Sequence, residues 1–123
     1  MIVFHGTSAY NAASIIVDGF SMDAFYSGSL GKGIYFSRDI DKCVEYGRHI
    51  LKVEIDEGSI LKDDFDSISS FAQSHSEINF NFMSQFEKYT LSKGYKGLEL
   101  STFNEIVVYD LSCIVSISQY AVK

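Results

Sequence analysis

Apolar residues recur along this chain at two spacings, one typical of strands and the other typical of helices. Residues 50–55 alternate apolar and charged side chains, which predicts a half-buried strand. Later in the chain an apolar residue returns every three or four positions, which predicts a helix that ends at Lys93-Gly94 and contributes to the core. The positions that define this helix are Ile78, Phe82, Phe86 and Tyr89.

The N-terminal segment predicts a strand followed by a short helix. Residues 2–5 are short and mostly apolar, as in a buried strand, and the strand ends on His5. Ser8 is a suitable N-cap for a helix over residues 9–17, because its hydroxyl can accept from an unpaired amide of the first turn. Gly19 follows at the position where a left-handed residue ends a helix.

The next segment predicts a loop, a second strand and a second helix. Residues 21–32 are rich in Gly and Ser and lack periodicity, so we expect a loop there. Residues 33–37 return to a strand pattern, and Asp39 begins a helix that Gly47 ends. That helix would present Cys43 and Tyr46 together on its inner face.

Three further strands are expected over residues 95–100, 105–109 and 114–118. Strands and helices therefore mix without the regular alternation of a parallel α/β fold, which predicts the α+β class. A chain of 123 residues is long enough to bury one core, so we expect a single domain over residues 1–123.

Composition and charge limit the cellular location, the state of the cysteines and the class of partner. No stretch approaches the roughly 20 apolar residues that cross a bilayer, and the start lacks the pattern of a secretory signal, so we expect a soluble protein of the cytoplasm or of a host cell's cytoplasm. Cys43 and Cys113 stand apart from any CxxC pair, which indicates reduced thiols and no structural metal site. The net charge of −6 disfavours a nucleic-acid partner, because phosphate neutralisation supplies most of such binding.

Three separated segments carry residues with recognisable chemistry: FHGTS, GKGIYFSRDIDKCVEYG and NEIVVYD. In this order they resemble the catalytic core of the ADP-ribosyltransferases, in particular the poly(ADP-ribose) polymerase-like branch with its His, Tyr, Glu triad. The compact length and the ending resemble the small single-domain members of bacteria and phages. The resemblance implies a split, two-sheet α+β fold and NAD as co-substrate, with no metal.

The resemblance also implies roles for individual residues. His5 would bond the adenosine ribose, and the backbone of Gly6 would hold the nicotinamide carboxamide. Tyr35 and Tyr46 would sandwich the flat, cationic nicotinamide ring, for which aromatic faces are suitable partners. Glu105 would bond the ribose 2′-hydroxyl and stabilise the positive charge that develops on the sugar. Thr7 and Gly33 complete the predicted cofactor-binding set, Gly33 because a backbone without Cβ can pass close to a ligand.

One position departs from the family pattern. The family usually has a serine whose hydroxyl bonds the carboxamide, and this chain has Cys43. A thiol is a weak donor and a weak acceptor, so Cys43 would contribute less to NAD affinity than a serine does. Lys32 and Lys42 in the second motif are interpreted as solvated, although either could contact a phosphate.

Together these observations predict an NAD-dependent mono-ADP-ribosyltransferase that releases nicotinamide and modifies a macromolecule, more plausibly a protein than a nucleic acid. The small family members are commonly toxins, effectors or phage modifiers of host machinery, including inhibitors of host defence. Two alternatives stay open: an NAD glycohydrolase with water as the acceptor, and a binding module that retains NAD or ADP-ribose without turnover. The sequence does not determine the oligomeric state.

Overall fold

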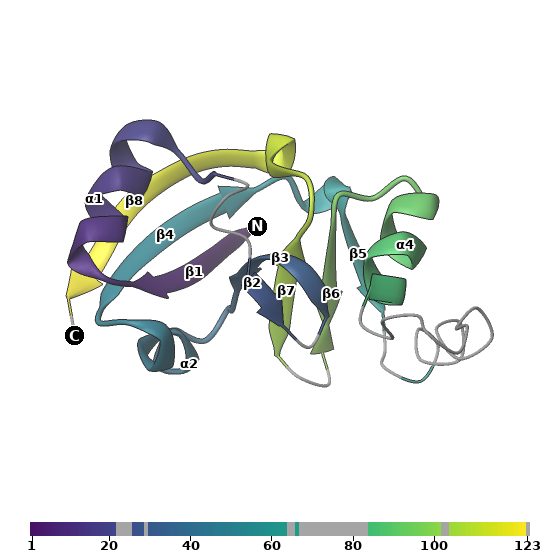
Figure 1. Ribbon diagram of the computed structural model, residues 1–123, viewed down its shortest axis with the longest axis horizontal. Helices are drawn as coiled ribbons and strands as arrows, with labels where there is room; N and C mark the ends of the chain where they lie inside the picture. Colours follow the sequence, from purple (N-terminus) through teal and green to yellow (C-terminus); the bar gives the residue numbers. More distant parts are fainter. Residues whose placement is uncertain (22–25, 29, 64–65, 67–83, 102–103, 123) are drawn as a thin grey trace.

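The computed structural model describes residues 1–21, 26–28, 30–63, 66, 84–101 and 104–122. It consists of two β-sheets with few helices, as the predicted α+β class requires. Figure 1 shows the three-stranded sheet with α1 toward one end of the molecule and the five-stranded sheet with α4 toward the other. The elements are β1 (Ile2–Thr7), α1 (Ala9–Asp18), β2 (Tyr26–Gly28), β3 (Gly31–Phe36), α2 (Ile40–Cys43), η2 (Val44–Tyr46), β4 (His49–Ile55), η3 (Glu57–Ser59), β5 (Ile60–Asp63), α4 (Ser84–Ser92), β6 (Gly97–Leu100), β7 (Glu105–Val108), η5 (Leu111–Cys113) and β8 (Ile114–Val122).

The smaller sheet combines the two ends of the chain with β4 from its middle. The smaller sheet has the order β1-β4-β8 and the larger one β2-β3-β7-β6-β5. All pairs are antiparallel except β5 with β6. Strand β3 leaves the larger sheet at its end, where Ser37 forms an isolated bridge with Phe4 of β1. The two sheets therefore meet at the residues that flank the predicted site.

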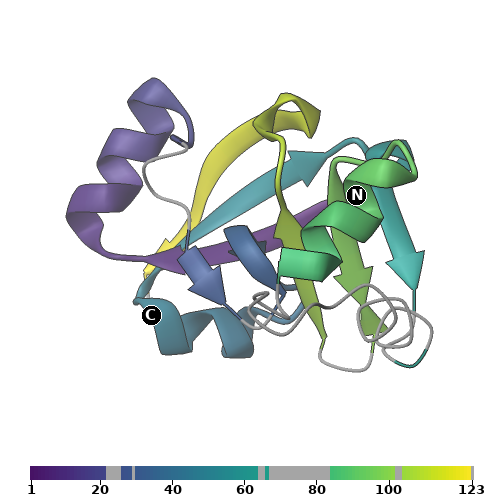
Figure 2. The same cartoon turned by 45° about the vertical axis from the view of Figure 1, so that its right-hand side comes forward.

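Two apolar clusters cover the two faces of the larger sheet. Strand β7 shows the alternation that a sheet imposes, because Ile106 and Val108 point into one cluster and Val107 and Tyr109 into the other. The first cluster joins the larger sheet to β1, β4 and α1. The second joins it to α4 through Phe86, which is 1% exposed. Figure 2 shows α4 lying across this second face.

The start of the chain follows its sequence pattern closely. The Ser8 hydroxyl accepts from the Asn11 amide at 3.2 Å, as expected for an N-cap. The Gly19 amide donates to the Ile15 carbonyl at 2.8 Å and ends α1. The predicted strand over residues 50–55 is also present, and its apolar positions are buried while Lys52 and Glu54 are exposed.

The predicted loop after α1 is wrong in part. Residues 21–32 contain β2 and the first residues of β3, where we expected only a loop. The reason is that β2 and β3 pair as antiparallel strands, in which Gly28 lies opposite Gly31 and Gly31 has a φ of 97°. Residues 22–25 and 29 lie outside the described part.

The predicted helix after Asp39 is divided. Asp39 does cap it, since its carboxylate accepts from the Asp41 amide at 2.9 Å. The α-helix stops at Cys43 and the chain continues as the 3-10 turn η2, a common way for a helix to end. Cys43 is therefore buried at 3% exposure while Tyr46 is 55% exposed.

The later part of the chain holds one strand that we did not expect. Strand β5 pairs with β6 in parallel, and a parallel partner requires a long connection that local pattern does not specify. Helix α4 confirms the helical spacing of Phe86 and Tyr89, whereas Ile78 and Phe82 lie outside the described residues. The three expected C-terminal strands are present with shifted ends as β6, β7 and β8.

Candidate active site

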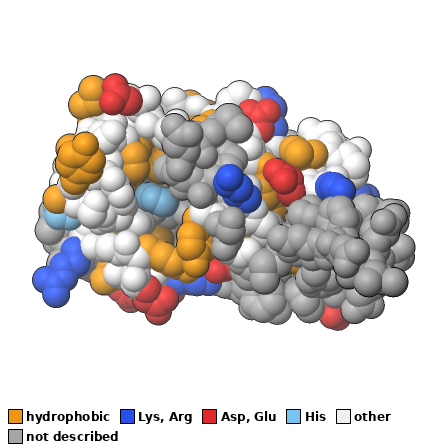
Figure 3. Space-filling model, in the orientation of Figure 1, with side chains coloured by type: hydrophobic (Ala, Val, Ile, Leu, Met, Phe, Trp, Pro, Cys, Tyr) orange, Lys and Arg blue, Asp and Glu red, His pale blue; other side chains and the backbone are white. Residues whose placement is uncertain are grey.

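One cavity gathers most of the residues that the sequence singles out. Its volume is about 170 Å³, close to the roughly 150 Å³ that accommodates a benzene-sized ring. Figure 3 shows this face, where a histidine side chain reaches the surface beside a group of hydrophobic side chains. Seven of the eight predicted site residues line the cavity, and Thr7 does not. The complete lining is His5, Gly6, Tyr26, Gly33, Ile34, Tyr35, Phe36, Ser37, Lys42, Cys43, Tyr46 and Glu105.

His5 is held in one orientation and one tautomer. Its Nδ1 lies 2.8 Å from the carbonyl oxygen of Tyr35. Because a carbonyl can only accept, Nδ1 carries the proton and Nε2 presents a lone pair. The ring packs edge-on against Phe20, with centroids 5.2 Å apart, and lies 5.5 Å from the ring of Phe36. Burial lowers the pKa of His5, so the ring is neutral near pH 7 and acts as a hydrogen-bond acceptor.

Tyr35 is fixed by its own hairpin. Its hydroxyl donates to the Gly31 carbonyl at 2.6 Å and accepts from the Leu30 amide at 3.0 Å. The ring lies so close to Gly28 that a Cβ there would be 2.6 Å from it, so the hairpin accommodates the ring only because residue 28 is glycine. Burial, with a smaller contribution from the charge of Glu105, raises the pKa of Tyr35 well above its usual value. The residue is therefore a neutral phenol with a locked ring.

Gly6 and Cys43 bring β1 and α2 into direct contact. A Cβ on Gly6 would lie 1.9 Å from the Cys43 carbonyl oxygen, so no larger residue fits without a backbone shift. The Cys43 thiol donates to the Phe4 carbonyl at 3.2 Å. Burial raises the pKa of Cys43 to about 11, so the sulfur remains a protonated thiol.

Glu105 and Lys42 form an ion pair in the cavity wall. Glu105 is the first residue of β7, and its Oε1 lies 3.7 Å from the Lys42 Nζ. The two side chains are 15% and 25% exposed respectively. The interpretation of Lys42 as a solvated residue is therefore wrong, because the turn into α2 brings it to the cavity. Sequence reasoning missed this contact since Lys42 and Glu105 are far apart in the chain.

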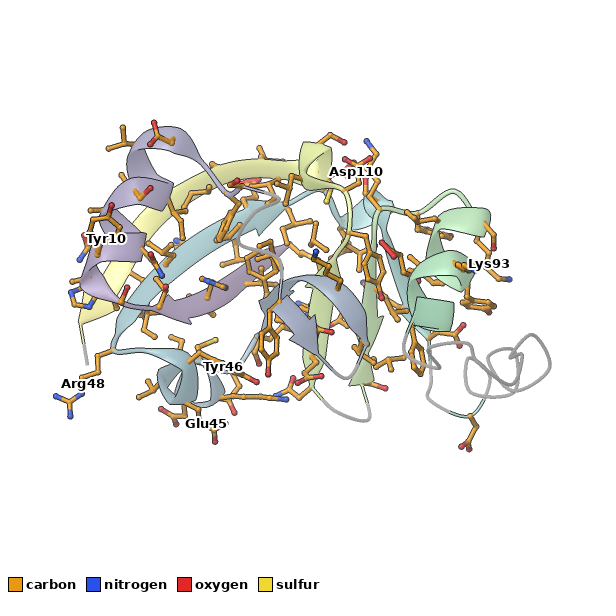
Figure 4. The ribbon with its side chains drawn as sticks, in the orientation of Figure 1. Tyr10, Glu45, Tyr46, Arg48, Lys93 and Asp110 are labelled. Atoms are coloured by element: carbon orange, nitrogen blue, oxygen red, sulfur yellow. The ribbon has the colours of Figure 1, made fainter. Side chains whose placement is uncertain are left out.

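Tyr46 lies at the cavity's edge, with more than half of its side chain exposed. In Figure 4 it is on the side of η2 nearer to β2 and β3, and Glu45 points outward. Burial, together with the nearby charge of Glu105, raises the pKa of Tyr46. A second exposed tyrosine, Tyr26 of β2, also lines the cavity and packs edge-on against Tyr35 at 5.8 Å.

Two of the predicted residues have surroundings that the sequence did not specify. Thr7 is buried at 8% exposure and lines a neighbouring cavity of about 420 Å³ under α1, which shares His5 and Ile34 with the first. Gly33 does line the first cavity, but a Cβ there would lie 2.6 Å from the Val108 carbonyl. Its lack of a side chain is therefore required by the packing of β3 on β7, which was not the predicted reason.

Sequence reasoning missed Tyr26, Ser37 and Lys42 as part of the lining. The glycines around residues 28–33 were a usable signal for a hairpin that carries Tyr26. Ser37 and Lys42 had no local signal, because their position depends on contacts between distant segments. Among the described residues, no group of three or more His, Cys, Asp and Glu side chains is placed to hold a metal ion. No helix in the described part is long and apolar enough to span a membrane.

The fold and site can now be compared with known proteins. Residues 1–55 match the family model of the poly(ADP-ribose) polymerase catalytic domain. The match supports a relationship to the ADP-ribosyltransferases and covers β1 to β4, so it includes His5, Tyr35 and Tyr46 and ends before Glu105.

A solved structure described as the crystal structure of an anti-CRISPR protein has a similar fold. Its TM-score is 0.51 at 13% sequence identity, over 98% of this chain and 95% of that one. No curated protein matches the chain significantly.

Proposed function

We propose that residues 1–123 form one ADP-ribosyltransferase-like catalytic domain, which transfers a single ADP-ribose unit from NAD to a macromolecule and releases nicotinamide. The observation that carries the proposal is the meeting of His5, Tyr35, Tyr46 and Glu105 around one cavity of ring size. These residues come from β1, β3, η2 and β7, so the fold gathers groups that are distant in the sequence. The family-model match to residues 1–55 supports the same reaction class.

The nicotinamide ring is the part of NAD that the cavity accommodates. Tyr35 and Tyr46 would present aromatic faces to it, and a cationic ring is attracted to such faces. The Gly6 backbone would bond the carboxamide, because Gly6 lines the cavity at the point where β1 meets α2. The Cys43 thiol would add a weak contact only, since it already donates to the Phe4 carbonyl.

The remainder of NAD would extend from His5 toward α1. The Nε2 lone pair of His5 can accept a hydrogen bond from a ribose hydroxyl, because Nδ1 is committed to the Tyr35 carbonyl. The neighbouring cavity under α1 shares His5 with the first and is lined by further polar side chains. Thr7, Asn11 and Ser14 are among them and would contact the adenosine half.

Glu105 supplies the charge that bond cleavage requires. The bond between nicotinamide and ribose C1′ breaks, nicotinamide leaves as a neutral molecule with the bonding electrons, and positive charge develops on the sugar. A carboxylate fixed in a partly dry wall stabilises that charge better than water does. A lone pair of the acceptor then forms the new bond to C1′, and the acceptor loses its proton. Lys42 lies beside Glu105 and holds its carboxylate in the wall.

A protein is the acceptor that the charge balance favours. The chain carries a net charge of −6, which repels a phosphate backbone.

For the biological role we propose the modification of host machinery by a small enzyme of bacterial or phage origin, acting in the cytoplasm as a toxin or as an inhibitor of defence. The fold of the anti-CRISPR neighbour is compatible with a phage-related role.

The test uses NAD labelled in its adenylate phosphate, incubated with the protein and a cell lysate. Release of nicotinamide with label in protein supports the proposal, and digestion with protease or nuclease identifies the class of acceptor. Free ADP-ribose as the sole product would replace the transferase by a glycohydrolase. Calorimetry that detects NAD bound and unconsumed would instead indicate a binding module. If the protein neither binds NAD nor releases nicotinamide, the proposal is overturned.

A further inference from the structure

The change of strand partner at Ser37 occurs beside the cavity. Strand β3 pairs with β7 up to Phe36 and Ile106, and the pairing stops before Ser37 and Glu105. The Ser37 backbone no longer bonds β7 there. Its amide donates to the Phe4 carbonyl at 3.0 Å, and its carbonyl accepts from the Phe4 amide at 2.8 Å. At this residue the main chain is therefore committed to β1, on the side of His5.

The Ser37 side chain restores the lost link to β7. Its hydroxyl donates to the Asn104 carbonyl at 3.1 Å and accepts from the Asp39 amide at 3.0 Å. The side chain is buried, with 3% of the residue exposed, and Ser37 lines the cavity. One hydroxyl thus joins the end of β3, the start of α2 and the residue before Glu105. A buried hydroxyl with both of its bonds made holds its neighbours in one arrangement.

The bond to Asn104 acts on the position of Glu105 in particular. The Asn104 carbonyl belongs to the same rigid peptide plane as the Glu105 amide, so a bond to the carbonyl orients the Glu105 Cα. Asn104 itself has a φ of 52°, a left-handed conformation that asparagine tolerates. The Ser37 hydroxyl holds the peptide plane that follows this residue.

We infer that Ser37 is a positioning residue for Glu105: its hydroxyl holds the Asn104–Glu105 peptide so that the carboxylate faces the cavity. The expected effect of Ser37 on the reaction rate rests on the proposed function. Its expected effect on the position of Glu105 rests on geometry alone. Ser37 does not touch the reacting atoms in this role. It sets the distance between the carboxylate and the sugar, and a misplacement of about 1 Å can reduce the rate by about 100-fold.

The first experiment reads the position of Glu105 without NAD. Carboxyl 13C NMR is recorded on protein labelled in glutamate, with the Glu105 signal assigned from the Glu105→Gln variant. In Ser37→Ala we expect the Glu105 signal to shift or broaden, and in Ser37→Thr, which retains a hydroxyl, to stay closer to wild type. Thr90→Val is the matched control, because Thr90 is also fully buried and bonds the Phe86 carbonyl at 2.8 Å, in α4. An unchanged Glu105 signal in Ser37→Ala would overturn the inference.

The second experiment separates positioning from general loss of structure. For Ser37→Ala we expect nicotinamide release to fall about 10- to 100-fold with NAD affinity within about twofold of wild type. The double variant Ser37→Ala/Glu105→Gln should be no slower than Glu105→Gln alone, since residues that act as a unit are not additive. A full, additive loss in the double variant would contradict the inference. A wild-type protein that releases no nicotinamide would refute the proposed function, and the NMR result would still decide the role of Ser37.

Discussion

The cavity has a buried wall and an exposed rim, and the two are built differently. The buried wall consists of Cys43 and of the partly buried His5, Tyr35 and Glu105. Of these, His5, Tyr35 and Cys43 are each bonded to a backbone carbonyl of another element or of the hairpin. The exposed rim consists of Tyr26 and Tyr46, whose side chains are 60% and 55% exposed. The wall is preorganised by folding, which suits groups that must stabilise a developing charge.

The side chains of the rim have more conformational freedom than those of the wall, so we expect them to serve binding and not catalysis. An exposed tyrosine loses side-chain entropy when a ligand orders it, so its contribution to affinity is smaller than its contact area suggests. It can also adapt to what approaches the cavity. We therefore expect changes in the wall to affect turnover, and changes in the rim to affect NAD binding.

Glu105→Gln should reduce nicotinamide release by about 100- to 1,000-fold, because the amide lacks the charge that stabilises the sugar in the transition state. The stability change should be small, since the amide is nearly isosteric. Steady-state assays and thermal unfolding measure the two effects. Glu99→Gln is the control: Glu99 is also 15% exposed and pairs with Arg38 at 2.7 Å, and that variant should release nicotinamide within about twofold of wild type. Activity retained by Glu105→Gln would remove Glu105 from the mechanism.

Tyr46→Ala should weaken NAD binding by about fivefold with a smaller effect on the maximal rate, because an aromatic face over a cationic ring contributes roughly 1 kcal/mol at an exposed site. Tyr46→Phe retains the face and should bind NAD nearly as well as wild type. Calorimetry measures both. Tyr10→Ala, at an 84% exposed position on α1, controls for the loss of a surface tyrosine. Equal affinity in Tyr46→Ala and wild type would exclude a stacking role for the rim.

Acid should destabilise the protein through His5. Burial lowers the folded-state pKa of His5, so the unfolded chain binds a proton more readily than the folded one. Stability should therefore fall as the pH drops below about 6.5, the ordinary pKa of histidine, toward the lower folded value. Thermal unfolding between pH 7.5 and pH 5 should show a steeper loss in wild type than in His5→Gln. Parallel curves for the two proteins would show that His5 is not the group responsible.

Cys43→Ser should have the smallest effect, with the Michaelis constant for NAD unchanged or lowered. A hydroxyl is a better donor than a thiol, both toward the Phe4 carbonyl and toward a carboxamide in the cavity. Steady-state kinetics at several NAD concentrations measure it. A large loss of activity would mean that the role assigned to this position of α2 is wrong.

Helices and strands were predictable where the side chains that determine them lie within one short segment. The N-cap at Ser8, the end of α1 at Gly19 and the alternation of β4 follow from side chains within a few residues. The hairpin that carries Tyr26 was missed although its glycines were a local signal. The division of the helix after Asp39 was not predicted, and it lies where α2 packs on the distant residue Gly6. No local propensity encodes a contact between such separate elements.

Local sequence is enough to identify the chemical groups of this protein and their order: an imidazole, several phenols, a thiol and a carboxylate in recognisable local settings. Tertiary structure decided which of them share a cavity, because His5 and Glu105 are brought together only when β1 meets β3 at Ser37 and β3 pairs with β7. It also separated the locked Tyr35 from the exposed Tyr46 and brought Lys42 to the carboxylate. The physical reason is that burial, hydrogen-bond partners and ion pairs depend on distances between segments, which the local pattern of side chains does not specify.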